Sequence, residues 1–84
     1  MIRILYFARF REQLGLAEEA LARPSGIDTL ADLLGHLRSR GGPWAETLPE
    51  GERLMMAVNQ ELARPETPIR DGDEVGIFPP VTGG

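Results

Sequence analysis

The 84-residue sequence contains no cysteine and no lysine. Without cysteine, the chain forms no disulfide, binds no metal through thiolates and has no cysteine nucleophile. All nine basic residues are arginine, so no side chain offers an amine through which copies of the chain could be joined to one another. Disulfide-stapled proteins, thiolate metal proteins and cysteine-dependent enzymes are therefore excluded.

Long apolar runs and an excess of positive charge are absent too. The apolar run within residues 1–10 is too short for the core of a signal peptide or for a membrane span, which predicts a cytoplasmic protein with no membrane partner. The formal net charge of −4 repels phosphate backbones, so nucleic acid is not an expected partner. Arg3, Arg9 and Arg11 precede the first acidic residue, and they form either a solvated strand end or a local basic patch that meets an acidic partner.

A chain of this length with 42% apolar residues can bury the core of one domain without disulfides or metals. Residues 2–8 are rich in strand-forming types and place apolar side chains on both faces of a first strand. Residues 10–15 are expected to form a helical turn closed by Gly15, and residues 18–24 a weaker second strand that Pro24 ends.

The one strongly periodic segment runs from Asp28 to about Arg40. Its leucines recur at the spacing of a helix face, with Asp28 or Thr29 as the N-cap. Gly41 and Gly42, which precede a proline, are expected to stop the helix. The remaining residues are predicted to form an irregular connection over 43–51, a strand over 53–60, an edge strand or crossing loop over 61–69, a tight turn at 71–73 and a last strand over 74–78.

This order of elements predicts an α+β domain in which a mixed sheet wraps one main helix and the first and last strands are neighbours. It fits a ubiquitin-like β-grasp. The domain is expected to span residues 1–78, and residues 79–84 are expected to form an extended tail. Because the helix covers only one face of such a sheet, the other face, which includes Leu5 and Phe7, is expected to be partly bare and to bind a partner.

Within the domain, no group of residues predicts an active site. The single histidine, His36, lies beside the leucine stripe of the helix and is expected to be solvated or partly packed. Asp71 and Asp73 flank a glycine as in part of a calcium loop, but the other ligands of such a loop are missing, which favours a turn. The chemistry is therefore expected in the tail.

The sequence ends in FPPVTGG, residues 78–84. Pro79 and Pro80 cannot donate hydrogen bonds to a sheet, so the last strand must release the chain there. The segment from Pro79 to Gly84 extends about 20 Å, which is enough to enter a narrow cleft of another protein. Because glycine has no β-carbon, an enzyme can bring a nucleotide phosphate close to the Gly84 carboxylate and activate it as an acyl adenylate.

Four stretches carry a family resemblance: FPPVTGG, DGDEVGI before it, AVNQ upstream, and ILYFARFREQLG at the start. With them the chain resembles the family of molybdopterin synthase small subunits, which are β-grasp sulfur carriers. The resemblance implies that an adenylyltransferase of the ubiquitin-activating type adenylates Gly84 with ATP. A sulfur donor protein then converts Gly84 to a thiocarboxylate, whose sulfur passes to cyclic pyranopterin monophosphate in the large synthase subunit.

The resemblance also assigns roles to residues. It gives the chemistry to Gly83 and Gly84, and it implies no bound cofactor, only a glycyl adenylate and a 1-thioglycine as transient modifications. The catalytic site is expected on the large subunit. The two kinds of subunit are expected to form a heterotetramer, in which this chain is the nucleotide-binding, sulfur-donating subunit. Residues expected to dock are Phe78, Pro79, Pro80, Val81 and Thr82, with Phe7, Arg11 and Leu62 on the partner face.

Two other functions fit the same tail. One is a sulfur carrier for another pathway, such as thiamine, cysteine or tRNA thiolation. The other is a protein modifier that is conjugated through Gly84, which predicts isopeptide adducts on lysines of other proteins.

Overall fold

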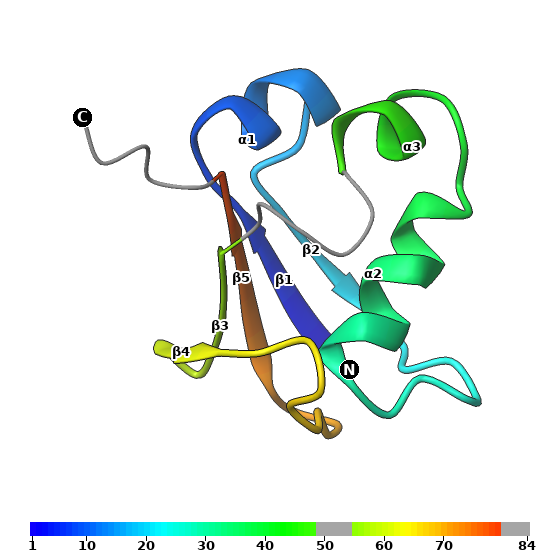
Figure 1. The fold of residues 1–84 in the computed structure, drawn as a ribbon, viewed down its shortest axis with the longest axis vertical. Coiled ribbons are helices and arrows are strands. Elements are labelled where there is room, and N and C mark those ends of the chain that lie inside the picture. The colour runs from blue at the N-terminus through cyan, green and yellow to red at the C-terminus, as the bar shows by residue number, and fades with distance from the viewer. Residues whose placement is uncertain (49–54, 80–84) are drawn as a thin grey trace.

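The computed structural model describes residues 1–48 and 55–79, which form a five-stranded sheet with helices packed on it (Figure 1). The order of the strands is β2-β1-β5-β3-β4. β1 and β5 pair in parallel, and the other neighbours are antiparallel. The elements are β1 (Ile2–Tyr6), α1 (Ala8–Leu14), β2 (Glu18–Leu21), α2 (Leu30–Arg38), α3 (Pro43–Thr47), β3 (Met55–Val58), β4 (Glu61–Ala63) and β5 (Glu74–Phe78). The predicted pairing of the first and last strands is confirmed.

The hydrophobic core lies between α2 and one face of the sheet. Because β1 alternates, its buried side chains Ile2, Ile4 and Tyr6 point to this core while Arg3 and Phe7 are exposed. On the sheet side, β5 adds the buried residues Val75 and Ile77. On the helix side, α2 contributes the predicted leucine stripe, namely Leu30, Leu33, Leu34 and Leu37.

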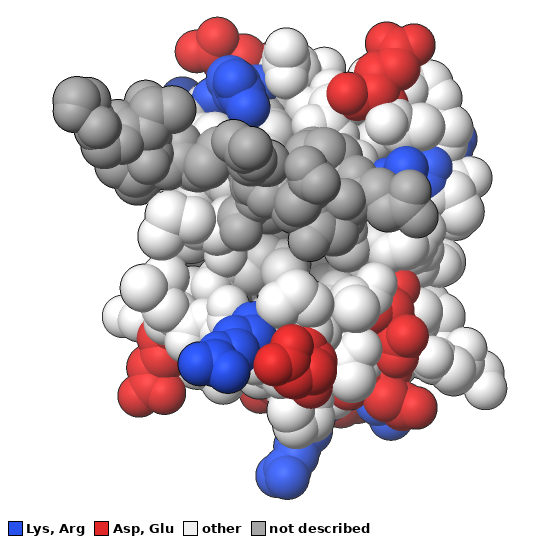
Figure 2. Space-filling model, in the orientation of Figure 1, with Lys and Arg blue, Asp and Glu red and all other residues white. Residues whose placement is uncertain are grey.

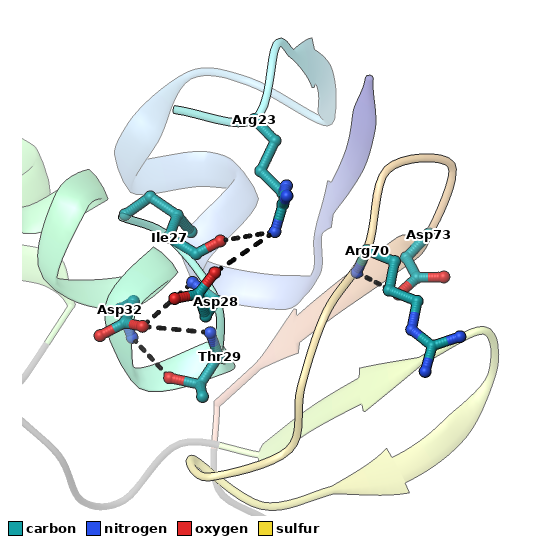
Figure 3. A network of polar contacts seen from close by, with 7 residues as sticks. All are labelled: Arg23, Ile27, Asp28, Thr29, Asp32, Arg70 and Asp73. Atoms are coloured by element: carbon teal, nitrogen blue, oxygen red, sulfur yellow. Dashed lines mark hydrogen bonds and ion pairs between the residues drawn. The ribbon is translucent and has the colours of Figure 1, made fainter. Parts of the chain in front are cut away.

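A network of polar contacts fixes the start of α2 (Figure 3). Thr29 is the N-cap, and its hydroxyl accepts a hydrogen bond from the backbone N–H of Asp32 at 3.2 Å. The Asp32 carboxylate accepts in return from the N–H groups of Asp28 at 3.0 Å and Thr29 at 3.2 Å. The hydrogen bond from the N–H of Asp28 is the main cause that lowers the pKa of Asp32, and hydrogen bonds with the backbone and side chain of Thr29 lower it further. This reciprocal arrangement is a capping box, and it decides between the two predicted N-caps in favour of Thr29.

The predicted irregular connection after α2 was wrong for residues 43–47, which form the short helix α3. Pro43 stands at its first turn, where a proline needs no hydrogen-bond partner for its nitrogen. Trp44 packs edge-on against Tyr6, with ring centroids 5.6 Å apart. In addition, the Nε of Arg38 donates to the carbonyl of Leu48 at 2.9 Å. α3 therefore closes one end of the core beside α1 (Figure 1).

β5 spans the predicted residues 74–78, whereas β1, β2 and β3 end earlier than predicted. β1 ends at Tyr6 rather than at residue 8, because Ala8 has a φ of 54° and turns the chain into α1. β3 ends at Val58 because Asn59 and Gln60, with φ values of 51° and 72°, form the turn into β4. The start of the predicted strand over 53–60 and most of the predicted tail over 79–84 lie outside the described residues.

None of the helices in residues 1–48 and 55–79 is both long enough and apolar enough to cross a bilayer.

Candidate functional site

An apolar groove lies where β5 ends and the final segment of the chain begins. Its volume is about 280 Å³. β4 supplies one wall through Leu62, which is 73% exposed. The full lining is Phe7, Ala8, Met55, Leu62, Phe78 and Pro79. Exposed apolar surface of this kind marks an interaction site.

The rings of Phe7 and Phe78 stack at the centre of the groove. Their centroids are 4.5 Å apart and their planes differ by 4°. The backbone holds the two residues in place, since the N–H of Phe7 donates to the carbonyl of Ile77 at 3.2 Å and so continues the β1–β5 pairing. The stack therefore joins the end of the first strand to the end of the last.

Gly76 leaves room for this stack. A β-carbon at Gly76 would lie 3.2 Å from the Phe78 ring and 3.3 Å from the Phe7 ring, closer than such carbons normally approach. In register with Gly76 are Leu5 on β1 and Ala57 on β3, and Ala57 in turn faces Leu62 on β4. Small residues thus form the middle of the sheet face predicted to be bare.

Two of the groove residues, Met55 and Ala8, were not predicted as site residues, and neither was Gly76, which leaves room for the stacked rings. Met55 falls in the predicted strand over 53–60, and it is opposite Phe78 in the β3–β5 register, which places it in the groove. That register depends on the turn at Asn59, so the sequence pattern alone does not provide it. Neither Ala8 nor Gly76 belongs to a sequence motif. The role of Ala8 is visible only in its left-handed backbone, and the role of Gly76 only in its closeness to the rings of Phe7 and Phe78.

The arginines near the N-terminus do not form one basic patch. Arg3, at the start of β1, pairs with Glu18 at 3.1 Å. Arg9 and Arg11 lie beyond the other end of β1, on α1, where the guanidinium carbon of Arg9 is 5.7 Å from the centroid of the Phe10 ring. On the face shown in Figure 2, basic and acidic side chains are interspersed at the edges. Arg11 is exposed but does not line the groove, and its role at the partner face stays a prediction.

A second cluster of side chains ties β2 to the end of α2, away from the groove. The guanidinium of Arg40 donates two hydrogen bonds to the Glu19 carboxylate, at 2.9 Å and 3.0 Å, and lies 4.4 Å from the centroid of the Trp44 ring. The hydroxyl of Tyr6 donates to Glu19 at 2.7 Å. The bond to Arg40 is the main reason why the pKa of Glu19 is lowered, while burial and the neighbouring Glu19 raise the pKa of Tyr6. Every member has a partner, so the cluster stabilises the fold and offers no free group for chemistry.

Asp71 and Asp73, the pair that flanks a glycine, make contacts within the fold. Asp73 accepts a hydrogen bond from the N–H of Arg70 at 2.8 Å (Figure 3). It also accepts one from the Asn59 amide at 3.1 Å. Asp71 pairs with the amino group of Met1. In residues 1–48 and 55–79, no three histidine, aspartate or glutamate side chains are placed to hold a metal ion. The N–H of Asp73 donates to the carbonyl of Arg70 at 3.1 Å, which confirms the predicted turn at residues 71–73.

The structure places Phe7, Leu62, Phe78 and Pro79 of the predicted docking residues together in the groove. The rest of the predicted site residues, Pro80, Val81, Thr82, Gly83 and Gly84, lie outside the described residues.

The parallel pairing of the first and last strands, with one main helix across the sheet and a groove at the end of the last strand, defines a ubiquitin-like β-grasp domain. The model of the ThiS family matches residues 4–84, and the chain belongs to this family. The family resemblance seen in the sequence is confirmed.

Individual relatives point in the same direction. The "Molybdopterin synthase sulfur carrier subunit" of Escherichia coli is 42% identical over 84 residues, which cover 100% of both chains. A solved structure from Pyrococcus furiosus, proposed to be subunit 1 of a molybdopterin converting factor, has a TM-score of 0.74 and 32% identity over 95% of this chain and 97% of that one. The small archaeal modifier protein 1 of Haloferax volcanii has a TM-score of 0.67 and 25% identity over 95% of this chain and 97% of that one. The relatives named as carriers support a sulfur-carrier role.

Proposed function

We propose that this chain is the sulfur-carrying subunit of a molybdopterin synthase. The observation that carries the proposal is the apolar groove at the end of β5, where the final segment of the chain begins. A carrier must present its terminal glycine to a partner, and a docking surface at the base of that segment aligns the two. The full-length relative from Escherichia coli is named as a subunit with this role.

The chemistry takes place at Gly84 in three steps. Its carboxylate oxygen attacks the α-phosphorus of ATP on an adenylyltransferase of the ubiquitin-activating type, and pyrophosphate leaves. A sulfide equivalent from a sulfur donor protein then attacks the acyl carbon, so that a carbon–sulfur bond replaces the bond to AMP. The thiocarboxylate sulfur finally passes to cyclic pyranopterin monophosphate on the large subunit, and Gly84 regains an oxygen from water. The carrier contributes an unhindered carboxylate, which is why a glycine suits the position.

The large subunit is the proposed occupant of the groove. Phe7 and Leu62 are exposed and Phe78 is half-buried, and the burial of these apolar side chains by a partner would supply the affinity. Pro79 belongs to the same surface and starts the segment that would enter the partner. Arg11, which is exposed on α1, would contact the rim of the partner. We propose a cytoplasmic location, where these partners would meet.

Reconstitution tests the proposal. The chain is combined with its large subunit, the adenylyltransferase, ATP, the sulfur donor and cyclic pyranopterin monophosphate, and molybdopterin is measured. We expect product with the complete chain and none after deletion of Gly84. If deletion of the gene instead leaves molybdoenzymes active and removes thiamine, cysteine or tRNA thiolation, the carrier serves another pathway. Isopeptide adducts on lysines in a lysate, together with intact molybdoenzyme activity in the deletion strain, would establish a modifier.

A further inference from the structure

We propose that the methyl group of Ala8 is a specificity-determining contact between this chain and the large subunit, an inference that rests on the proposed function. Ala8 is exposed, lines the groove and has a φ of 54°. A residue with a β-carbon is strained in this left-handed region of backbone space, where glycine is not. The chain therefore has an alanine methyl group at a position where the backbone conformation alone favours glycine.

The other left-handed positions show how unusual this choice is. In residues 1–48 and 55–79, five glycines have positive φ, and only Ala8, Asn59 and Gln60 do so with a side chain. Asn59 is a residue type that tolerates this conformation, and it forms the β3–β4 turn together with Gln60. Ala8 lies in no hairpin turn, and alanine has no side-chain hydrogen bond that could offset the strain.

Neighbouring contacts prevent the backbone at Ala8 from relaxing. The residue before it is fixed on both sides, because the N–H of Phe7 donates to Ile77 at 3.2 Å and its carbonyl accepts from the N–H of Phe10 at 3.2 Å. The stacked ring of Phe78 holds the Phe7 side chain as well. Strain that surrounding contacts enforce at an exposed position is typical of functional sites.

The benefit of the methyl group is expected on docking. Because Ala8 is exposed, the methyl gains little from burial within this chain, whereas a partner that fills the groove would bury it beside Phe7 and Leu62. Burying one such carbon corresponds to roughly a fourfold gain in affinity.

The test compares Ala8→Gly with Gln60→Gly, which relieves the same kind of backbone strain in the β3–β4 turn, outside the lining of the groove. Thermal unfolding and the Kd for the purified large subunit are measured for both. We expect both melting temperatures to stay equal or to rise by a few degrees. Only Ala8→Gly should weaken binding, by roughly fourfold to tenfold. Ala8→Ser, which keeps the β-carbon, should retain most of the affinity.

Unchanged affinity of Ala8→Gly would overturn the inference, and so would a marked fall in its melting temperature, since the methyl would then serve the fold. Aromatic NMR shifts of Phe78 report whether the stack is intact, and affinity lost together with the stack would likewise assign Ala8 to the fold. If the complete chain itself does not bind the large subunit, the docking step of the proposed function is wrong, which is a different outcome from a variant that binds normally.

Discussion

The ring of Phe7 lies flat against the ring of Phe78, with centroids 4.5 Å apart and planes within 4° of each other. One ring follows the first strand and the other ends the last strand, and these strands pair in parallel. The stack is only partly covered, since 37% of Phe7 is exposed. It therefore stabilises the end of the sheet and also presents an aromatic surface beside the segment that leads to Gly84.

Phe7→Ala should weaken binding of the large subunit more than it weakens the fold. Loss of the stack is expected to lower the free energy of unfolding by about 1 kcal/mol, because the ring is exposed and the pair contributes mainly its own contact. Binding should fall at least about tenfold, because aromatic anchors dominate interfaces. Isothermal titration and chemical denaturation measure the two effects.

Trp44→Ala is the matched control for this prediction, because Trp44 is a half-buried aromatic residue that packs on Tyr6 and does not line the groove. It should lower stability more than Phe7→Ala does and leave the affinity of the folded protein unchanged. Equal affinities of wild type and Phe7→Ala would remove the groove from the interface.

Gly76→Ala and Gly35→Ala should have opposite effects on stability. An alanine at Gly76 meets the rings of Phe78 and Phe7 at 3.2 to 3.3 Å, so both rings must shift. We expect a loss of about 1 kcal/mol and changed aromatic NMR shifts. Gly35 is in the middle of α2 with nothing within 4 Å of an added β-carbon, so alanine there should stabilise by about 0.5 to 1 kcal/mol. If both variants gain stability to the same degree, the rings do not depend on Gly76.

Glu19→Gln should destabilise the protein at neutral pH but not in acid. The amide cannot balance the Arg40 charge, and we expect a loss of roughly 1 to 2 kcal/mol for this part-buried pair. The Arg40 hydrogen bonds lower the folded-state pKa of Glu19, so its carboxylate stabilises the fold above the unfolded pKa of about 4.3. This contribution disappears as the pH falls through the lowered folded pKa, and the two proteins should then become equally stable.

The control for this prediction is Glu18→Gln. Glu18 pairs with Arg3, but the two side chains are 53% and 58% exposed. Solvent screens such a pair, so the substitution should change stability by less than about 0.5 kcal/mol at any pH. A difference between wild type and Glu19→Gln that does not vary with pH would contradict the role assigned to the carboxylate charge.

The arrangement of the fold could be predicted from the sequence because its strongest signals are local. The leucine spacing of α2, the alternation of β1 and the C-cap at Gly15, which has a φ of 69°, were all visible as patterns. α3 was missed because Gly41 and Gly42 were taken as the end of helical structure. The same proline that followed them also favours a first helical turn, and the packing of Trp44 on Tyr6 decides in favour of the helix.

The candidate site could be predicted only in part. Phe7, Leu62 and Phe78 were named from the sequence, but their contact depends on strand register and on a groove that no local pattern describes. The left-handed backbone at Ala8 runs against the ordinary preference of alanine and is imposed by contacts with β5. The pair of Glu19 and Arg40 likewise joins segments distant in sequence, so it appears only once β2 and α2 are placed together.

The most direct test of the sulfur-carrier role is the intact mass of the protein after incubation with ATP, the adenylyltransferase and the sulfur donor. We predict a gain equal to the exchange of one oxygen for one sulfur, and no gain when Gly84 is deleted. A chain whose mass stays unchanged while the same enzymes convert an established carrier, or whose gain persists without Gly84, would contradict the account.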